Sequence, residues 1–468
     1  MTARHRPEGA PPLARTLARA ALGPAPEALG AEVAEKVGLC LLDHLACAFE
    51  SRTLPWSRQA LALAELSSGA GTVIGGPAGV GLGDAAFANG VLGHGLVRED
   101  MHAGSVSHLG VVILPALLAL AQHRRVAGVD FAAAAVAGYE VGAKVGRALI
   151  DPDIALSHRP TGITGPLAAA AAGARALGLG EDAAVAALAL AANTTAGLNE
   201  WAHTGGSEMY FHPGFAARNA LSAVLLAEAG AFASPSALDG DAGLFASLGK
   251  QSAAAAVALF TGAPEILAVY FKPVPACNFA QTACQAALRV IADGARSDDI
   301  ADIAVRVPGA AAAYPGCDFT GPFDQPLQAK MSIQYNVAAA LRHGGVSERN
   351  YMERDDAEVA RLLAATRLEV DEALSRAFPA RQGAEVVVTL RAGATRRARL
   401  DDVVPATPDQ VRARFRAAAE AALGEARARA LEAAVDGIDR LDDAGRIAAL
   451  AAPGAAAARP KHARSLGA

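Results

Sequence analysis

From Leu13 to about residue 260, apolar residues recur every three or four positions along the chain. In the segment 32–49, for instance, Val33, Val37 and Leu41 fall on one side of a helix, because an α-helix turns once in about 3.6 residues. Further helices are predicted at 57–67, 109–121, 131–149, 167–177 and 183–192. The last four segments are apolar almost all round, which is typical of helices buried inside a larger helical assembly.

The pattern changes after Pro273. Residues 300–307 alternate between apolar and polar and end before a proline, which predicts a strand. Residues 385–390 and 396–400 flank an Ala-Gly-Ala turn and predict a hairpin. A further short strand is predicted at 368–370, and helices at 337–341 and 356–364. This part of the chain therefore predicts a smaller α+β unit.

Helical periodicity returns after Pro408, at 411–422 and 425–435, and we expect these helices to pack back on the first domain. The fold class is predicted to be mainly α, with a large all-helical domain and a smaller α+β domain. The expected boundaries are 13–268 for the helical domain, 269–404 for the α+β domain, 405–450 for the helical return and 451–468 for a disordered tail.

Composition supports the helical prediction and excludes some functions. Hydrophobic residues make up 52% of the chain but aromatic residues only 5%, and alanine, a good helix former and a poor strand former, is abundant. The net charge of −5 argues against a nucleic-acid partner, which normally requires a basic excess. No apolar stretch reaches the roughly 20 residues of a membrane span.

The N-terminus lacks the apolar core of a signal peptide. Five cysteines without a CxxC pair are too few for a disulfide scaffold, and we expect buried or free thiols in a reducing compartment. The expected location is the cytoplasm.

Common cofactor motifs are missing from the sequence. The glycine run at 75–83 does not spell GxGxxG, no clear helix follows it, and a surface loop is expected there. The chain contains no HExxH, GxSxG or P-loop motif. The motifs therefore support neither a nucleotide-binding site nor a metal site.

Histidines concentrate in the segment HGLVREDMHAGSVSH. If its first nine residues form a helix, His94, Arg98 and His102 lie on one face and Glu99 points elsewhere. His108 follows, directly before an apolar helix whose N-terminus suits an anionic group. Histidine titrates near neutrality and moves protons in either direction. The alternative is that these histidines are surface residues or hydrogen-bonded core residues.

Three further polar clusters interrupt the apolar pattern. His158 and Arg159 lie in a break between two apolar helices, and residues 201–214 form a second break that is also expected between helices. Lys272 lies at the predicted domain junction, where small-molecule clefts are common. An ordinary solvated lysine is the alternative at that position.

Several blocks resemble the MmgE/PrpD family in the family's own order, over roughly residues 30–430. Among them are AAFANGVLGHGL, PTGITGPLAAAAAGARALGL, FKPVPACNFAQTACQAAL and AKMSIQYNVAAAL. The family includes 2-methylcitrate dehydratase, cis-aconitate decarboxylase and iminodisuccinate epimerase. The resemblance implies a helical domain, an α+β lid, an active site between them, a homodimer, and acid–base chemistry on small polycarboxylates without a cofactor.

The resemblance also implies site residues, and this chain keeps only some of the family pattern. Kept family residues are Asp100, His108, Lys272 and Tyr335. Positions at which the chain departs from the family pattern are Val97, Met101, Arg159, Met209 and Gln281.

These positions and the histidine cluster together define the candidate site. The candidate catalytic residues are His108, Lys272, Tyr335, His102 and Asp100. The candidate substrate-binding residues are Arg98, His158, Arg159, Met209 and Gln281. In this set His108, with His102, moves the proton, Tyr335 protonates a leaving hydroxyl or a carbanion, and Lys272 binds a carboxylate. The family pattern has a lysine at the position of Met209, and Arg98 and Arg159 replace its positive charge.

The sequence therefore predicts a cofactor-independent lyase or isomerase. Its expected partner is a small carboxylic acid other than 2-methylcitrate, because the set of proton-transferring residues has changed. Neither a nucleic acid nor a membrane is an expected partner. Two alternatives remain open, namely a specialised-pathway cyclase or other reaction on the same scaffold, and a binding homologue without catalytic activity.

Overall fold

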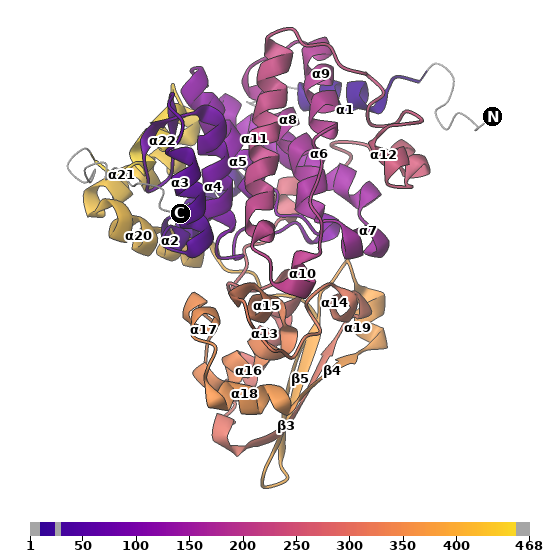
Figure 1. Ribbon diagram of the computed structural model, residues 1–468, viewed down its shortest axis with the longest axis vertical. Helices are drawn as coiled ribbons and strands as arrows, with labels where there is room; N and C mark the ends of the chain where they lie inside the picture. The colour runs from indigo at the N-terminus through magenta and orange to yellow at the C-terminus, as the bar shows by residue number, and fades with distance from the viewer. Residues whose placement is uncertain (1–9, 24–29, 455–468) are drawn as a thin grey trace, which may run out of the picture.

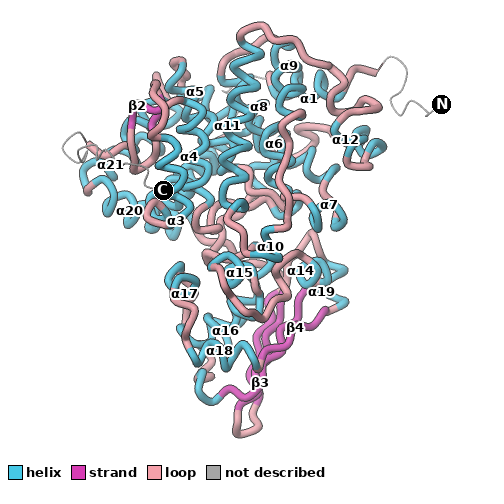
Figure 2. The backbone as a smooth tube through the Cα atoms, in the orientation of Figure 1, coloured by secondary structure: helices cyan, strands magenta, loops and turns pink. Residues whose placement is uncertain are grey.

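The computed structural model describes residues 10–23 and 30–454. These residues form a large helical part and, below it in Figure 1, a smaller part that contains a β-sheet. Figure 2 shows helices throughout and most of the strands in one small region, which confirms the predicted mainly-α fold class. Of the predicted tail, residues 455–468 lie outside the described residues. Ala451 is the last residue of a helix that begins at Gly445.

The helical part is built around tightly packed apolar helices. Its N-terminal helices are α1 (Leu13–Ala21), α2 (Ala31–Ser51), α3 (Pro55–Ala64), α4 (Leu82–His94), α5 (Gly110–His123), α6 (Gly128–Leu149), α7 (Pro152–Ser157), α8 (Pro160–Ala176), α9 (Glu181–Ala192), α10 (Trp201–Thr204), α11 (Glu208–Glu228) and α12 (Leu244–Ser247). Helix α11 packs against α4, α5, α8 and α9, and α6 packs against α8. Within the described residues, no helix combines the length and the apolar character needed to cross a membrane.

Small residues allow these helices to approach closely. A Cβ atom added to Gly90 of α4 would lie 3.0 Å from the Cα atom of Gly214 in α11. A Cβ atom added to Gly214 would lie 2.6 Å from the carbonyl oxygen of Phe87. Such distances leave no room for a side chain, so the abundance of alanine and glycine serves close helix packing rather than flexibility.

The α+β part comprises residues 278–400. Its helices and strands are α13 (Gln281–Ala292), β3 (Ile300–Val307), α14 (Gly309–Ala313), α15 (Pro326–Met331), α16 (Ile333–His343), α17 (Glu348–Met352), α18 (Ala357–Ala364), β4 (Thr366–Val370), α19 (Glu372–Ala377), β5 (Ala384–Leu390) and β6 (Thr395–Leu400). The strand order is β4-β3-β5-β6, with β3 parallel to β4 and the other pairs antiparallel. The predicted strands and hairpin are confirmed.

The two faces of the sheet differ in chemistry. Val386 and Val388 of β5 are fully buried, and α13 packs against β5 and β6. Arg306 of β3 instead forms ion pairs with Glu369 on β4 and Glu385 on β5. One face is therefore apolar and covered by helices, whereas a row of charges links three strands elsewhere on the sheet.

The last helices lie beside the first ones (Figure 1). They are α20 (Pro408–Leu423), α21 (Glu425–Asp436) and α22 (Gly445–Ala451). Helix α20 begins with a capping box between Thr407 and Gln410 and packs on α2, while α22 packs on α5. We count these helices with the helical part. The predicted domain boundaries at 268, 404 and 450 stay predictions.

Two local predictions were wrong. The glycine run at 75–83 contains the short strand β2 (Ala78–Val80), paired with β1 (Gly71–Thr72), and it leads directly into α4. Helix α4 is buried on every side from Ala85 to His94 and therefore shows no amphipathic period. Residues 208–214 belong to α11, with Pro213 inside the helix, and are not a break between helices.

A buried lysine joins the two parts. Lys330, at the end of α15, has no exposed surface, and its ammonium donates hydrogen bonds to the Leu96 carbonyl at 3.2 Å and to Glu348 at 2.7 Å. The same nitrogen lies 5.6 Å and 5.7 Å from the ring centres of Trp56 and Tyr210, which stack on each other. A cation of the α+β part is thus held by a carbonyl and two aromatic rings of the helical part.

Replacing this lysine should weaken the whole structure. Lys330→Met keeps the apolar stem but leaves the largely buried Glu348 carboxylate without its cation, so we expect the free energy of unfolding to fall by about 3 kcal/mol. Arg349→Met is the matched control, because its ion pair with Glu353 is exposed and should contribute less than about 1 kcal/mol. Urea denaturation followed by circular dichroism measures both, and equal losses in the two variants would contradict this role.

Candidate active site

A narrow pocket lies where the two parts meet. Its lining residues from the helical part are Val97, Met101, Val106, His108, Arg159, Trp201 and Met209. Its lining residues from the α+β part and the segment leading into it are Cys277, Asn278, Phe279, Tyr314 and Met331. The space open to the centre of a water molecule is about 20 Å³, which suits about one water. A larger ligand therefore requires the lining loops or side chains to move apart.

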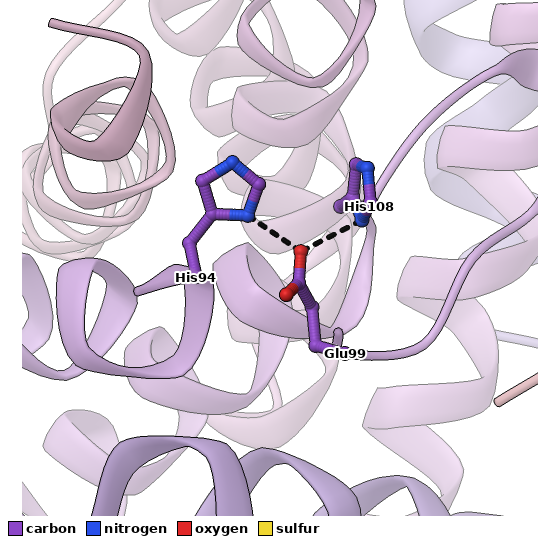
Figure 3. Close-up of side chains that lie close together, drawn as sticks. All are labelled: His94, Glu99 and His108. Atoms are coloured by element: carbon purple, nitrogen blue, oxygen red, sulfur yellow. Dashed lines mark hydrogen bonds and ion pairs between the residues drawn. The ribbon is translucent and has the colours of Figure 1, made fainter. Parts of the chain in front are cut away.

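A sharp change of direction after α4 shapes one wall of the pocket. The helix ends at His94, and Val97 adopts a left-handed backbone conformation with φ of 56°. This conformation is unfavourable for a β-branched residue and costs about 1–3 kcal/mol. The prediction that residues 94–102 form one helix is therefore wrong. Beyond the turn, Glu99 points back toward the end of α4 (Figure 3).

Glu99 is shared by two histidines, as Figure 3 shows. Its Oε1 atom accepts a hydrogen bond from His94 Nδ1 at 2.5 Å and lies 2.7 Å from His108 Nδ1. Glu99 and His94 have no exposed surface, and His108 is 3% exposed. Because Nδ1 of each ring faces the carboxylate, each Nε2 is left as the lone-pair nitrogen that can accept a proton.

The charges of this cluster follow from its contacts. Burial acts to raise the pKa of Glu99, but the two histidines outweigh it and hold that pKa well below its ordinary value. Burial, together with the charge of Lys272, lowers the pKa of His108 to about 3. Burial also lowers the pKa of His94. At neutral pH the cluster therefore holds one carboxylate and two neutral imidazoles, with His108 ready to act as a base.

The same three residues have the spacing of a metal site. One ligand atom of each lies within 4.8 Å of the others. However, the charges of Arg159 and Lys272 act on His94, where they lower its pKa. Two fixed cations beside the cluster disfavour a divalent metal ion. The cluster is therefore poorly matched to a divalent metal ion, and the predicted absence of a metal stays a prediction.

Arg159 brings an unpaired positive charge to the pocket. Its Nη2 atom lies 3.2 Å from His94 Nε2 and 3.8 Å from the Met209 sulfur, and its Nη1 atom lies 3.4 Å from the Tyr314 hydroxyl oxygen. The guanidinium also lies 5.8 Å from the Trp201 ring. Arg159 is only 5% exposed, its Nε atom has no hydrogen-bond partner, and it forms no ion pair with a carboxylate of the described residues. A buried arginine of this kind is suited to an anionic ligand.

The loop after Lys272 is held by Gln281. The side-chain amide of Gln281 accepts from the Val274 N–H and donates to the carbonyls of Val274, Ala276 and Cys277. The Lys272 ammonium is fully buried and donates to the Ala276 carbonyl at 3.2 Å. In this conformation Gln281 is therefore occupied with shaping the loop, and Lys272 acts on the pocket through its charge rather than by lining it.

Two residues of the expected histidine face turn away from the pocket. Arg98 forms an ion pair with Glu50 at 2.5 Å. His102 contacts the Ser105 hydroxyl at 2.7 Å and Glu265 at 3.0 Å. Both side chains are consequently engaged in contacts outside the pocket lining.

Three other candidates also lie outside the lining. Asp100 accepts a hydrogen bond from the Tyr139 hydroxyl at 2.8 Å, and burial raises its pKa to about 7. The Tyr335 hydroxyl donates to the Asn350 carbonyl at 2.5 Å. His158 contacts its neighbour, the Ser157 hydroxyl. Of the predicted site residues the structure therefore brings His108, Arg159 and Met209 together at the pocket. The five catalytic and five substrate-binding roles stay predictions.

Sequence reasoning missed the centre of the cluster. Glu99 was expected to point away from the histidines, and His94 was not chosen as a site residue, yet both contact each other beside His108. The acidic stretch between the histidines was a usable signal, but the left-handed turn at Val97 that redirects it is not visible in a sequence. Tyr314 comes from a distant loop and carried no local signal. Cys277 lies in the block FKPVPACNFAQTACQAAL but was not chosen as a site residue.

Comparison with known proteins agrees with this architecture. The family model described as the MmgE/PrpD N-terminal domain matches residues 15–256, and the MmgE/PrpD C-terminal domain matches residues 274–440. The chain is 34% identical over 215 residues to a cis-aconitate decarboxylase-like protein, oryM, of Aspergillus oryzae, a match that covers 44% of each chain. It is 31% identical over 207 residues to a cis-aconitate decarboxylase of Aspergillus terreus, with 42% of each chain covered.

The relatives and the family models cover different shares of this chain. The relatives are matched over less than half of their length. The two family models, in contrast, span most of this chain, from the first helix to the helices that return after the sheet. On that basis the chain belongs to the MmgE/PrpD family.

Proposed function

We propose that this protein is a cofactor-independent lyase or isomerase that moves a proton on the carbon next to a carboxylate of a small organic acid. The observation that carries the proposal is the neighbourhood of Arg159 and His108. A buried guanidinium with no carboxylate partner in the part of the chain that the structure describes lines a narrow pocket. The same pocket is lined by an imidazole whose Nδ1 lies against a buried carboxylate. The Arg159 guanidinium is suited to hold the anion, and the His108 imidazole is suited to take the proton.

The proposed reaction follows from these positions. Arg159 binds the substrate carboxylate, and Nε2 of His108 removes the neighbouring proton. Negative charge then builds up on the carboxylate oxygens, where Arg159 and the charge of Lys272 stabilise it in a site with little water. Glu99 stabilises the imidazolium that forms on His108, because its carboxylate lies 2.7 Å from Nδ1.

The protonation state of the free site favours some outcomes over others. His108 is neutral at pH 7, so it can begin a reaction by accepting a proton, as dehydration and epimerisation require. A decarboxylation instead ends with protonation of the carbanion and needs an acid at that step. We therefore favour a reaction that starts with proton abstraction.

The lining of the pocket suggests the kind of substrate. Met209 stands where the family pattern has a lysine, and its sulfur lies 2.9 Å from His94 Nε2. Most other lining side chains are apolar, among them Val97, Met101 and Phe279. One guanidinium among apolar walls is better matched to an acid with few carboxylates and an apolar substituent than to a tricarboxylate. We propose such an acid as substrate, distinct from 2-methylcitrate.

Loss of the proposed base should stop proton exchange. Proton NMR in deuterium oxide, with a panel of small mono-, di- and tricarboxylic acids that includes cis-aconitate, identifies the acid that exchanges. For that acid, we expect His108→Gln to slow deuterium incorporation by about 10²–10⁴-fold, because no other group replaces the base. His123→Gln is the matched control, since His123 also lies beside a glutamate, Glu228, but outside the pocket. Unchanged exchange in a folded His108→Gln variant would refute the role of His108.

The neutral state of His108 has a measurable pH dependence. In the folded protein its imidazole should stay neutral from pH 8 to 5, whereas in urea it should titrate near the ordinary value of about 6.5. Because the unfolded chain binds this proton and the folded protein does not, the free energy of unfolding should fall as the pH drops from about 6.5 toward 3. Nitrogen-15 NMR of labelled histidine follows the titration, and protonation near pH 6.5 in the folded state would contradict the assignment.

The anion site has its own test. Arg159→Met should raise the KM for the exchanging acid by about 100-fold or more and abolish the increase in melting temperature that the acid produces. Arg218→Met, which removes a half-exposed arginine paired with Asp84, should change neither the KM nor the increase in melting temperature. A binding protein without catalytic activity would show the increase in melting temperature but no deuterium exchange in the unmodified chain.

A further inference from the structure

We propose that Cys277 and Cys317 form a peroxide-sensitive thiol pair that closes to a disulfide at the wall of the pocket. Their sulfur atoms lie 3.5 Å apart. Cys277 lines the pocket and is 4% exposed, whereas Cys317 is fully buried. All five cysteines are free thiols in this structure. The inference rests on these contacts and does not depend on the proposed function.

Backbone hydrogen bonds hold the two sulfurs against each other. The Cys277 N–H donates to the Lys330 carbonyl at 3.1 Å, and the Ile333 N–H donates to the Cys317 carbonyl at 2.9 Å. Lys330 and Ile333 lie on either side of the junction between α15 and α16, so one short segment fixes both cysteine loops. A disulfide has a sulfur–sulfur distance of about 2.0 Å, which means that the atoms need to approach by about 1.5 Å.

The two thiols differ in reactivity. Burial acts to raise the pKa of Cys277, but the contact with Cys317, the Phe279 N–H and the charge of Lys272 together lower it. Burial raises the pKa of Cys317 well above its ordinary value. Since the thiolate is the reactive form, Cys277 is the thiol that meets the oxidant and Cys317 is the one that resolves the product.

Hydrogen peroxide is the oxidant, and the atoms balance in two steps. The Cys277 thiolate attacks one peroxide oxygen, the O–O bond breaks, and a sulfenic acid and hydroxide form. The hydroxide takes the Cys317 proton, which gives the first water. The Cys317 thiolate then attacks the Cys277 sulfur, the S–O bond breaks, and the sulfenic oxygen leaves as hydroxide. This hydroxide takes up the proton that Cys277 released when it ionised, which gives the second water. Two thiols and one peroxide thus give one disulfide and two waters.

The disulfide should alter the pocket. Cys277 directly precedes Asn278 and Phe279, which line the pocket as well. When the Cys277 sulfur moves toward Cys317, it withdraws from the wall and pulls this short segment with it. Oxidation should therefore change what the pocket accepts, and reduction with dithiothreitol should restore it.

Thiol counting and peptide mapping test the proposal. The full-length protein is treated with hydrogen peroxide, quenched with catalase, denatured and alkylated with iodoacetamide. We expect alkylatable thiols to fall from five to three and the mass before alkylation to fall by about 2 Da. Peptide mapping without reductant should show Cys277 linked to Cys317. Retention of all five thiols, or a link that involves another cysteine, would overturn the proposal.

Two variants separate this pair from the other thiols. In Cys317→Ser the resolving thiol is missing, so Cys277 should accumulate as a sulfenic acid that dimedone traps. Cys284→Ser is the control and should still form the disulfide, because burial raises the pKa of Cys284 to about 12 and so keeps this thiol protonated. If Cys317→Ser does not fold, Cys317→Ala serves for the same trapping. A folded variant in which dimedone labels Cys284 instead of Cys277 would refute the assignment.

Discussion

The centre of this protein is a single carboxylate oxygen shared by two histidines. Glu99 has no exposed surface, and a buried carboxylate is tolerated only where close partners stabilise its charge. His94 and His108 provide that stabilisation at 2.5 Å and 2.7 Å. The same contacts fix the tautomer of both rings. One arrangement therefore stabilises the buried charge and leaves the Nε2 lone pair of each ring facing away from the carboxylate.

The cations around this carboxylate tie the site to the junction of the two parts. Arg159 and Lys272 act on the cluster through their charges, and Lys330, a short distance away, is held between a carboxylate and aromatic rings. Each is almost completely buried. Buried cations are costly without partners. These three lie where the helical part and the α+β part meet, with Lys330 paired to Glu348 and Arg159 lining the narrow pocket.

Most of the fold follows from local sequence pattern. The alternation at 300–307 and the hairpin around Gly393 predicted strands that the structure contains, since a half-buried strand must alternate its side chains. Helix α4 escaped detection because Gly83, Gly90 and Gly93 interrupt its apolar residues, and glycine is a poor helix former. For the site, His108, Arg159 and Met209 were chosen from the sequence and do line the pocket, whereas Glu99 was expected to point away from it.

The sequence by itself determined the helical class, the small sheet and the presence of histidine and arginine near a domain junction, because these depend on the order of neighbouring residues. Only the tertiary structure decided which of them meet. The left-handed turn at Val97 directs Glu99 to two histidines, and packing of distant loops brings Cys277 against Cys317. Both contacts depend on the direction of the backbone and on packing between distant segments. These are set by the free energy of the whole folded molecule and not by the order of neighbouring residues.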